Sequence, residues 1–149
     1  MPLPSQRMSD GTLIASISGI RGIVGDGLDP SVLVRYAAAY GTWARRRARS
    51  DGRDPLIVVG RDARPSGPVC ASIVIATLQS MGCDVVDAGL ATTPTVEMAV
   101  IEEEAAGGII LSASHNPEPW NALKLLNERG EFLTPAEGEA VMQMADREE

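Results

Sequence analysis

Two short, uninterrupted apolar runs place the strongest constraint on how this chain folds. Residues 56–59 end at Gly60, and residues 108–111 lead directly into a polar loop. Such runs are typical of strands that are covered on both faces of a sheet. Segments with helical periodicity alternate with them, so the sequence predicts an α/β domain, a three-layer α/β/α sandwich with a mostly parallel, mixed sheet.

Turn and cap signals define the remaining elements. Residues 13–17 and 85–86 are predicted to be strands, and residues 121–126 an extended segment. The spaced glycines of residues 19–25 instead predict a loop whose backbone N–H groups could hold a phosphate. Helices are predicted after Asp29-Pro30, over residues 69–78 with a stop at Gly82, from residue 92 to about 104, and after a capping box at residues 134–137.

The length of 149 residues suits one domain. We expect residues 1–15 to be a leader with the start of the first strand, and residues 16–149 to be the domain itself. The last helix reaches the final residue without a stop signal. We therefore expect the chain to end near the linker to a downstream domain of the same polypeptide.

Composition disfavours several classes of function. The net charge of −7 makes a nucleic-acid partner a poor expectation, and the basic residues 45–49 are expected to complement the negative end of a helix. Pro, Gly or charged residues interrupt every apolar run before it reaches membrane-spanning length, so no membrane partner is expected. Cys70 and Cys83 are predicted to be buried free thiols of a cytoplasmic protein.

The most unusual segment is Ser112-Ala113-Ser114-His115-Asn116-Pro117, named here the Ser114 loop. It directly follows a predicted buried strand, and open α/β sheets bind ligands outside the carboxyl ends of their strands. His115, Lys124 and nearby backbone N–H groups could donate hydrogen bonds to a phosphate on Ser114. The loop is therefore a candidate site for a covalent phosphate.

A serine hydrolase is the competing interpretation of this loop. The pattern Gly-x-Ser-x-Gly is absent from the sequence. His115 is the direct neighbour of Ser114, which is poor geometry for a base that takes the serine proton. The hydrolase is accordingly disfavoured.

Arginines elsewhere supply two further candidates. Arg21 lies among the glycines of residues 19–25, and its planar guanidinium can grip a phosphate with two hydrogen bonds. The cluster Arg61-Asp62-Ala63-Arg64 follows a predicted strand. For Arg61, phosphate binding and interdomain electrostatics both stay open, whereas Asp62 is expected to form an internal Arg–Asp pair that fixes the loop.

Four motifs follow one another along the chain. They are Gly19-Ile20-Arg21-Gly22, residues 60–67, residues 87–95 and the Ser114 loop. In order and spacing they resemble the α-D-phosphohexomutase family, which includes phosphoglucomutase, phosphomannomutase and phosphoglucosamine mutase. The resemblance runs from about residue 16 to the end, and it is to the first of the family's α/β/α domains.

The resemblance implies a phosphoserine enzyme, an intramolecular phosphotransferase. Ser114 would donate its phosphoryl group to a hexose phosphate and form a sugar bisphosphate, whose other phosphate then returns to the serine. The net result moves phosphate between the 1- and 6-positions of the sugar. A Mg²⁺ ion would be bound through the phosphate on Ser114, with its other ligands outside this chain.

The resemblance also assigns roles to individual residues. Arg21 and Lys124 match family positions beside the phosphoserine, where they stabilise charge and assist proton transfer. His115 is expected to act with them in catalysis, and Asn116 and Arg61 are expected to contact the substrate.

The chain departs from the family pattern at two places. Ser18 stands where the family usually has Asp, and Ala122 stands where it usually has Gly, so the local turn is expected to differ. The family's metal-binding, sugar-recognising and distal phosphate-binding loops belong to its later domains. We therefore expect the isolated chain to have little or no mutase activity; the alternative is a non-catalytic binding or regulatory module of the same fold.

Overall fold

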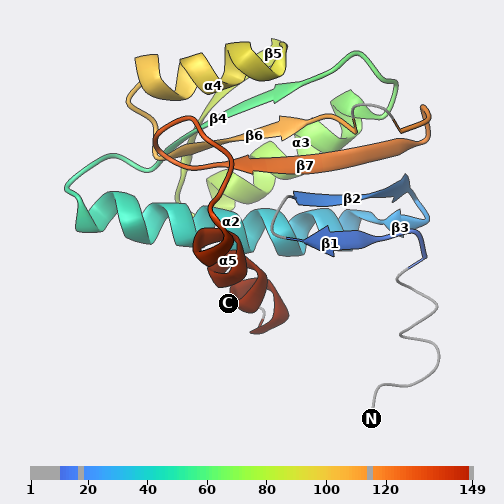
Figure 1. The fold of residues 1–149 in the computed structure, drawn as a ribbon, viewed down its shortest axis with the longest axis horizontal. Coiled ribbons are helices and arrows are strands. Elements are labelled where there is room, and N and C mark those ends of the chain that lie inside the picture. Colours follow the sequence, from blue (N-terminus) through green and yellow to red (C-terminus); the bar gives the residue numbers. More distant parts are fainter. Residues whose placement is uncertain (1–10, 17–18, 114–115, 148–149) are drawn as a thin grey trace.

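The computed structural model describes residues 11–16, 19–113 and 116–147. In these ranges a seven-stranded sheet runs in the order β1-β2-β7-β6-β4-β5, and the short strand β3 pairs with β2 (Figure 1). The strands are β1 (Ile14–Ser16), β2 (Gly19–Val24), β3 (Gly27–Leu28), β4 (Leu56–Arg61), β5 (Asp84–Leu90), β6 (Gly107–Leu111) and β7 (Trp120–Leu126). The helices are α2 (Pro30–Ser50), α3 (Gly67–Ser80), α4 (Thr93–Glu102) and α5 (Pro135–Arg147).

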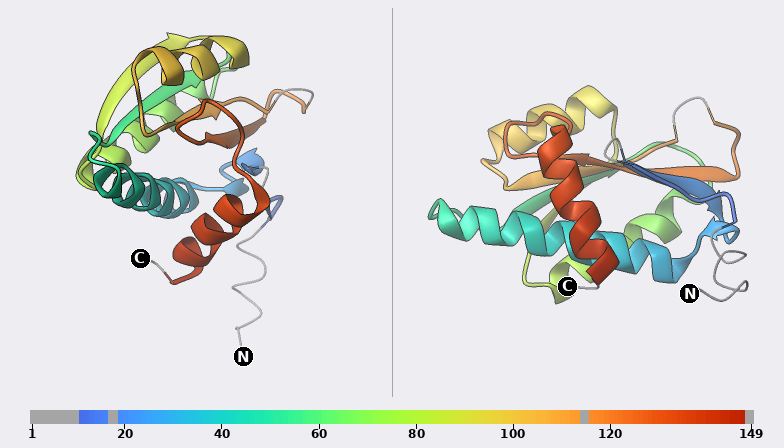
Figure 2. Two further views of the ribbon diagram at one scale, coloured as in Figure 1. Left: turned by 60° about the vertical axis from the view of Figure 1, so that its left-hand side comes forward. Right: turned by 60° about the horizontal axis from the view of Figure 1, so that its bottom comes forward.

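Helices cover both faces of the sheet, which confirms the predicted three-layer α/β architecture. Helices α2, α3 and α5 lie on one face and α4 lies on the other (Figures 1 and 2). The larger core cluster joins the first three helices to the sheet, through residues such as Tyr40, Val74 and Val141. A smaller cluster joins α4 to the sheet through Val96 and Val100.

The sheet is mixed, and its parallel part lies at one side. Strand β4 pairs in parallel with β5 and β6, and β2 pairs in parallel with β3. The pairs β1·β2, β2·β7 and β6·β7 are antiparallel. The antiparallel share is therefore larger than the sequence alone indicates, because residues 121–126 form a full strand between β2 and β6.

The predicted glycine-rich loop at residues 19–25 is wrong. Residues 19–24 form β2, and Ile20, Arg21 and Gly22 pair with residues of β7. The backbone groups of this segment thus belong largely to the sheet, which removes the basis for a phosphate-holding loop. Gly22 is needed for packing, because a Cβ there would lie 3.1 Å from the backbone nitrogen of Leu28.

The predicted helix boundaries are largely confirmed. Asp29 is the N-cap of α2 with proline at the first helical position, and Gly82 follows α3 with a φ of 88°. The arginines of residues 45–49 lie in the last turns of α2, as expected. No helix among the described residues is long and apolar enough to cross a bilayer.

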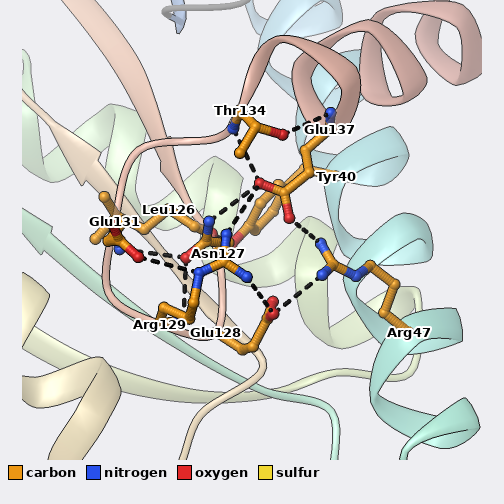
Figure 3. Close-up of polar contacts among 9 residues, drawn as sticks. All are labelled: Tyr40, Arg47, Leu126, Asn127, Glu128, Arg129, Glu131, Thr134 and Glu137. Carbon is orange, nitrogen blue, oxygen red and sulfur yellow. Dashed lines mark hydrogen bonds and ion pairs between the residues drawn. The ribbon is translucent and has the colours of Figure 1, made fainter.

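A polar network fixes the turn after β7 to α2 and α5 (Figure 3). Glu137 accepts hydrogen bonds from the Thr134 backbone N–H (2.9 Å), Asn127 (3.0 Å) and Arg47 (2.6 Å). Thr134 accepts in return from the Glu137 backbone N–H at 3.2 Å, so the predicted capping box is confirmed. The network lies at the opposite end of β7 from the Ser114 loop and stabilises the sheet from that end.

Both cysteines are buried and free, as the sequence predicts. Cys70 is 0 % and Cys83 4 % exposed, and burial raises the pKa of each thiol. We expect both thiols to react with a disulfide reagent at mildly alkaline pH at least about tenfold more slowly in the folded protein than in urea. Time-resolved thiol labelling checks this, and equal rates in the two conditions would contradict the buried placement.

Candidate active site

Ser114 and His115 lie outside the described residues, so their placement stays a prediction, while the residues on either side are described. The Ser112 backbone N–H donates to the carbonyl of Ala122 at 3.1 Å, which extends the β6·β7 ladder by one residue. The Asn116 backbone N–H donates to the Ala113 carbonyl at 3.0 Å. The Ser114 loop therefore leaves the carboxyl end of a buried strand, as the sequence predicts.

Arg21 and Lys124 come together on one face of the sheet. Arg21 lies opposite Ala122 in the antiparallel pair of β2 and β7, and Lys124 follows two residues along β7. Opposite residues, and residues two apart on a strand, share a face. A pocket of about 340 Å³ is lined by these three residues together with Ser16, Gly19 and Leu123.

This face is the one that α4 covers only in part. Lys124 lies opposite Ile110, and Ile110 packs in the smaller core cluster with Val96 and Val100 of α4. Helix α4 lies over the β4 and β6 side of the sheet and leaves the β2 side uncovered (Figure 2). Arg21 is consequently exposed, and Lys124 is half-buried between it and the helix.

The environment of Lys124 changes its acidity. Partial burial lowers the pKa of the Lys124 ammonium, the carboxylate of Asp62 raises it, and the charges of Arg64 and Arg21 lower it further. Taken together, these effects lower the pKa of Lys124. A lowered pKa weakens the hold of the Lys124 side chain on its proton.

Arg61 lies in a different pocket, so the predicted site residues do not form one cluster. This second pocket, of about 560 Å³, is also lined by Ser112 and by residues at the start of α4, including Thr92 and Thr93. This second pocket borders the carboxyl end of β6, whereas the first is lined in the sheet by residues of β1, β2 and β7. Arg61 therefore remains a candidate substrate contact, separate from Arg21 and Lys124.

The expected internal Arg–Asp pair is present, and Arg64 supplies the arginine. Its Nε donates to Asp62 Oδ2 at 2.9 Å, and its backbone N–H donates to Asp62 Oδ1 at 3.2 Å. Arg64 also contacts the carbonyls of Pro117, at the end of the Ser114 loop, and of Trp120, and the sequence alone does not predict these contacts across more than fifty residues. The position of Arg64 next to Asp62 in the sequence indicates the ion pair. A local sequence pattern cannot predict contacts with residues so far away in the chain.

The family departure at Ala122 fits the strand without strain. Ala122 is 4 % exposed and lies in the regular β2·β7 ladder, and its backbone N–H donates to the side-chain oxygen of Asn121 at 2.8 Å. The Ala122 methyl group thus faces the pocket between Arg21 and Lys124. The other departure, Ser18, lies outside the described residues.

The described residues do not by themselves fit a magnesium ion. No group of three or more His, Cys, Asp or Glu side chains that could hold a metal occurs among them. The carboxylate next to Lys124 belongs to Asp62, and it is already paired with Arg64. A hard cation needs several oxygen ligands, so this part of the chain lacks a complete site.

Comparisons with known proteins agree with the fold described above. A family profile described as "Phosphoglucomutase/phosphomannomutase, alpha/beta/alpha domain I" matches residues 13–149. The chain is 40 % identical over 125 residues to a phosphoglucomutase/phosphomannomutase of Thermococcus kodakarensis, covering 84 % of this chain and 26 % of the relative. It is 34 % identical to a phosphoglucosamine mutase of Leuconostoc mesenteroides, covering 88 % of this chain and 29 % of the relative.

A solved structure shows the same arrangement of elements. The crystal structure of a putative phosphomannomutase from Thermus thermophilus superimposes with a TM-score of 0.79 at 31 % identity, covering 91 % of this chain and 30 % of that one. The fold and the motifs around Arg21, Asp62 and Lys124 define an α/β/α domain of the sugar-phosphate mutase type. The chain belongs to the phosphoglucomutase/phosphomannomutase family, as its domain I. It spans between a quarter and a third of the length of these relatives.

Proposed function

We propose that this chain is the phosphoserine-bearing part of a phosphohexomutase, with Ser114 as the phosphoryl carrier. The observation that carries the proposal is the meeting of Arg21 and Lys124 on the open face of the sheet, next to the strand that leads to Ser114. Phosphoryl transfer depends mainly on positioning and on neutralising charge, and two cations beside a strand end provide both. Family membership supplies the independent support.

The proposed reaction has two balanced steps. First, the bond between phosphorus and Ser114 Oγ breaks, and phosphorus bonds to a free hydroxyl oxygen of a hexose monophosphate. The sugar hydroxyl loses its proton and Ser114 Oγ gains one, which gives a sugar bisphosphate. In the second step the bond between the other phosphorus and its sugar oxygen breaks, and this phosphorus bonds to Ser114 Oγ. The serine hydroxyl loses its proton and the released sugar oxygen gains one, which leaves the isomeric hexose monophosphate.

The described residues have distinct parts in these steps. Arg21 neutralises phosphate oxygens, since its guanidinium stays charged. Lys124 is suited to exchange a proton with the reacting hydroxyl groups, because burial lowers its pKa. Arg61 and Asn116 are proposed contacts of the substrate, and His115 a catalytic neighbour of the phosphoserine. A Mg²⁺ ion would be held through the phosphate on Ser114 and through ligands outside this chain, and it would supply positive charge there.

Phosphopeptide mapping of the protein isolated from the cells that make it tests the proposal. The protein is analysed before and after incubation with Mg²⁺ and glucose 1,6-bisphosphate. We expect one phosphoryl group on Ser114, its loss in Ser114→Ala, and its retention in the matched control Ser112→Ala. An unmodified Ser114 in both samples overturns the proposal and favours a non-catalytic module. The isolated 149-residue chain is expected to give no measurable mutase turnover of glucose 1-phosphate.

A further inference from the structure

Arg64 joins the residues just after β4 to residues 117–120, which begin with the last residue of the Ser114 loop. Its side chain is only 11 % exposed, and its Nε donates to Asp62 Oδ2 at 2.9 Å, just after the end of β4. Its Nη1 donates to the carbonyl of Trp120 at 2.6 Å and lies 3.3 Å from that of Pro117. One guanidinium thus connects the end of β4 with residues 117–120.

The segment of residues 117–120 needs donors from outside itself. It contains Pro117 and Pro119, which have no backbone N–H, and the Trp120 N–H is used on the Pro117 carbonyl at 3.0 Å. The carbonyl of Pro119 accepts from the backbone N–H of Val24 at 3.0 Å, on the β2 side. Arg64 supplies the donors on the β4 side.

The next residue is tied to the same place. Asn121 is 0 % exposed, and its side-chain nitrogen donates to the hydroxyl of Ser66 at 3.0 Å. Ser66 lies two residues after Arg64, at the start of α3. Side chains from residues 62–66 therefore hold the start of β7 at two neighbouring points.

The chemistry of the guanidinium suits this arrangement. Arginine presents five donors in a rigid plane, so it can serve a carboxylate and two carbonyl oxygens together. A lysine side chain ends in a single nitrogen, so it cannot contact the carboxylate and both carbonyl oxygens with separate nitrogen atoms. The Asp62 carboxylate orients the guanidinium and also balances its charge beside Lys124.

We propose that Arg64 is a positioning residue that fixes residues 117–120, and with them the carboxyl-terminal side of the Ser114 loop, to the end of β4. The mechanical part of the proposal is that Arg64 holds residues 117–120 in place, and the described contacts alone support it. Its consequence for phosphoryl transfer rests on the proposed function. Arg64 acts through the backbone that leads to Ser114 and has no direct part in the chemistry.

Amide hydrogen exchange tests the mechanical part. In Arg64→Gln and Arg64→Lys, exchange of the Trp120 amide is expected to rise at least about tenfold, because the guanidinium hydrogen bonds to the Trp120 and Pro117 carbonyls are lost. Core amides of β4 and β6, such as Val58 and Ile109, are expected to stay within about twofold. The matched control is Arg53→Gln, which changes an exposed arginine in the turn after α2. Unchanged exchange at Trp120, or equal acceleration at Trp120 and in the core, overturns the inference.

A titration separates positioning from a merely structural role. Among the described residues, the charges of Asp62, Arg64 and Arg21 act on Lys124. Loss of the Arg64 charge in Arg64→Gln is expected to raise the Lys124 pKa, and Asp62→Asn is expected to lower it. Asp62→Asn also serves as a milder variant should Arg64 variants fail to fold. NMR of the Lys124 ammonium reports both shifts, and a pKa unmoved by either change contradicts the proposed arrangement.

Phosphopeptide mapping distinguishes the two proposals. If Arg64 positions the loop of a phosphoserine enzyme, phosphate at Ser114 falls at least about tenfold in Arg64→Lys, while the melting temperature stays close to that of the parent. Full phosphorylation of Arg64→Lys would refute the functional consequence. Absence of phosphate from the parent protein would refute the proposed function and leave the exchange result to decide the mechanical part.

Discussion

Gly107→Ala is expected to destabilise the protein by about 3 kcal/mol. Gly107 is the first residue of β6 and is buried. A Cβ there would overlap the hydroxyl oxygen of Tyr40 and lie 2.7 Å from the carbonyl oxygen of Leu126. The Leu126 carbonyl is backbone within the sheet, so the clash cannot be relieved by a side-chain rotation alone.

The Tyr40 hydroxyl occupies this space because it serves the sheet. Tyr40 is 0 % exposed on α2, and its oxygen lies 2.6 Å from the carbonyl of Leu126 and 3.1 Å from that of Gly108. Burial raises the pKa of Tyr40, so the hydroxyl stays a donor across the accessible pH range. Helix α2 and the β6·β7 pair are thereby joined at the end of the sheet remote from the Ser114 loop.

Chemical denaturation of a double-mutant cycle tests this account. Tyr40→Phe alone is expected to cost about 1–2 kcal/mol through the lost hydrogen bond. In Gly107→Ala/Tyr40→Phe the overlapping oxygen is gone. The double variant is therefore expected to lose about 1 kcal/mol less stability than the sum of the losses in the two single variants. The control Gly52→Ala has open space around it but a φ of 70°, and about 1–2 kcal/mol is expected. Additive costs in the cycle would show that the hydroxyl is not the source of strain.

Much of this fold could be predicted because its signals are local. The apolar runs of β4 and β6 identify buried strands, and the capping box at Thr134 identifies the start of α5. Strand β2 was not predicted, because spaced glycines in a sequence usually indicate turns. In the structure Gly22 instead makes room for Leu28. That requirement arises from packing between segments, which a sequence pattern does not contain.

The candidate site likewise has residues that the sequence predicts and contacts that it does not predict. Arg21 and Lys124 were recognised from motifs, and the register of β2 on β7 explains why they meet. The link from Arg64 to Trp120 was missed, because both acceptors on residues 117 and 120 are backbone carbonyls that every residue type carries. Side-chain identity marks the residues that do chemistry more clearly than those that hold backbone in place.

Glu137→Gln is expected to lower the free energy of unfolding by about 2 kcal/mol at pH 7 and to remove part of the protein's acid sensitivity. Burial alone would raise the pKa of Glu137, but hydrogen bonds from the Thr134 backbone, Asn127 and Arg47, with the Arg47 charge, lower it from 4.5 to about 2. The full shift corresponds to about 3 kcal/mol. The Glu137 side chain is 13 % and that of Arg47 35 % exposed, so solvent screening reduces the expected value.

The sign of the pH dependence follows from the direction of the shift. In the unfolded chain Glu137 binds its proton near pH 4.5, and in the folded protein only near pH 2. The stabilisation is therefore complete above about pH 5 and is lost as the pH falls toward 2. Glu137→Gln lacks this titration, so the difference in stability between parent and variant should shrink over the same interval.

Urea denaturation at a series of pH values between 7 and about 2 measures both curves. The matched control is Glu139→Gln, an exposed glutamate two residues further along α5, for which a change within about 0.5 kcal/mol is expected at every pH. Parallel curves for Glu137→Gln and the parent would show that Glu137 titrates as an ordinary carboxyl. A converging pair would show that one carboxylate joins α2, the turn after β7 and α5, far from the Ser114 loop. Acid would then loosen that end of the sheet, while the contacts of Arg64 at the other end would be unaffected by the titration of Glu137.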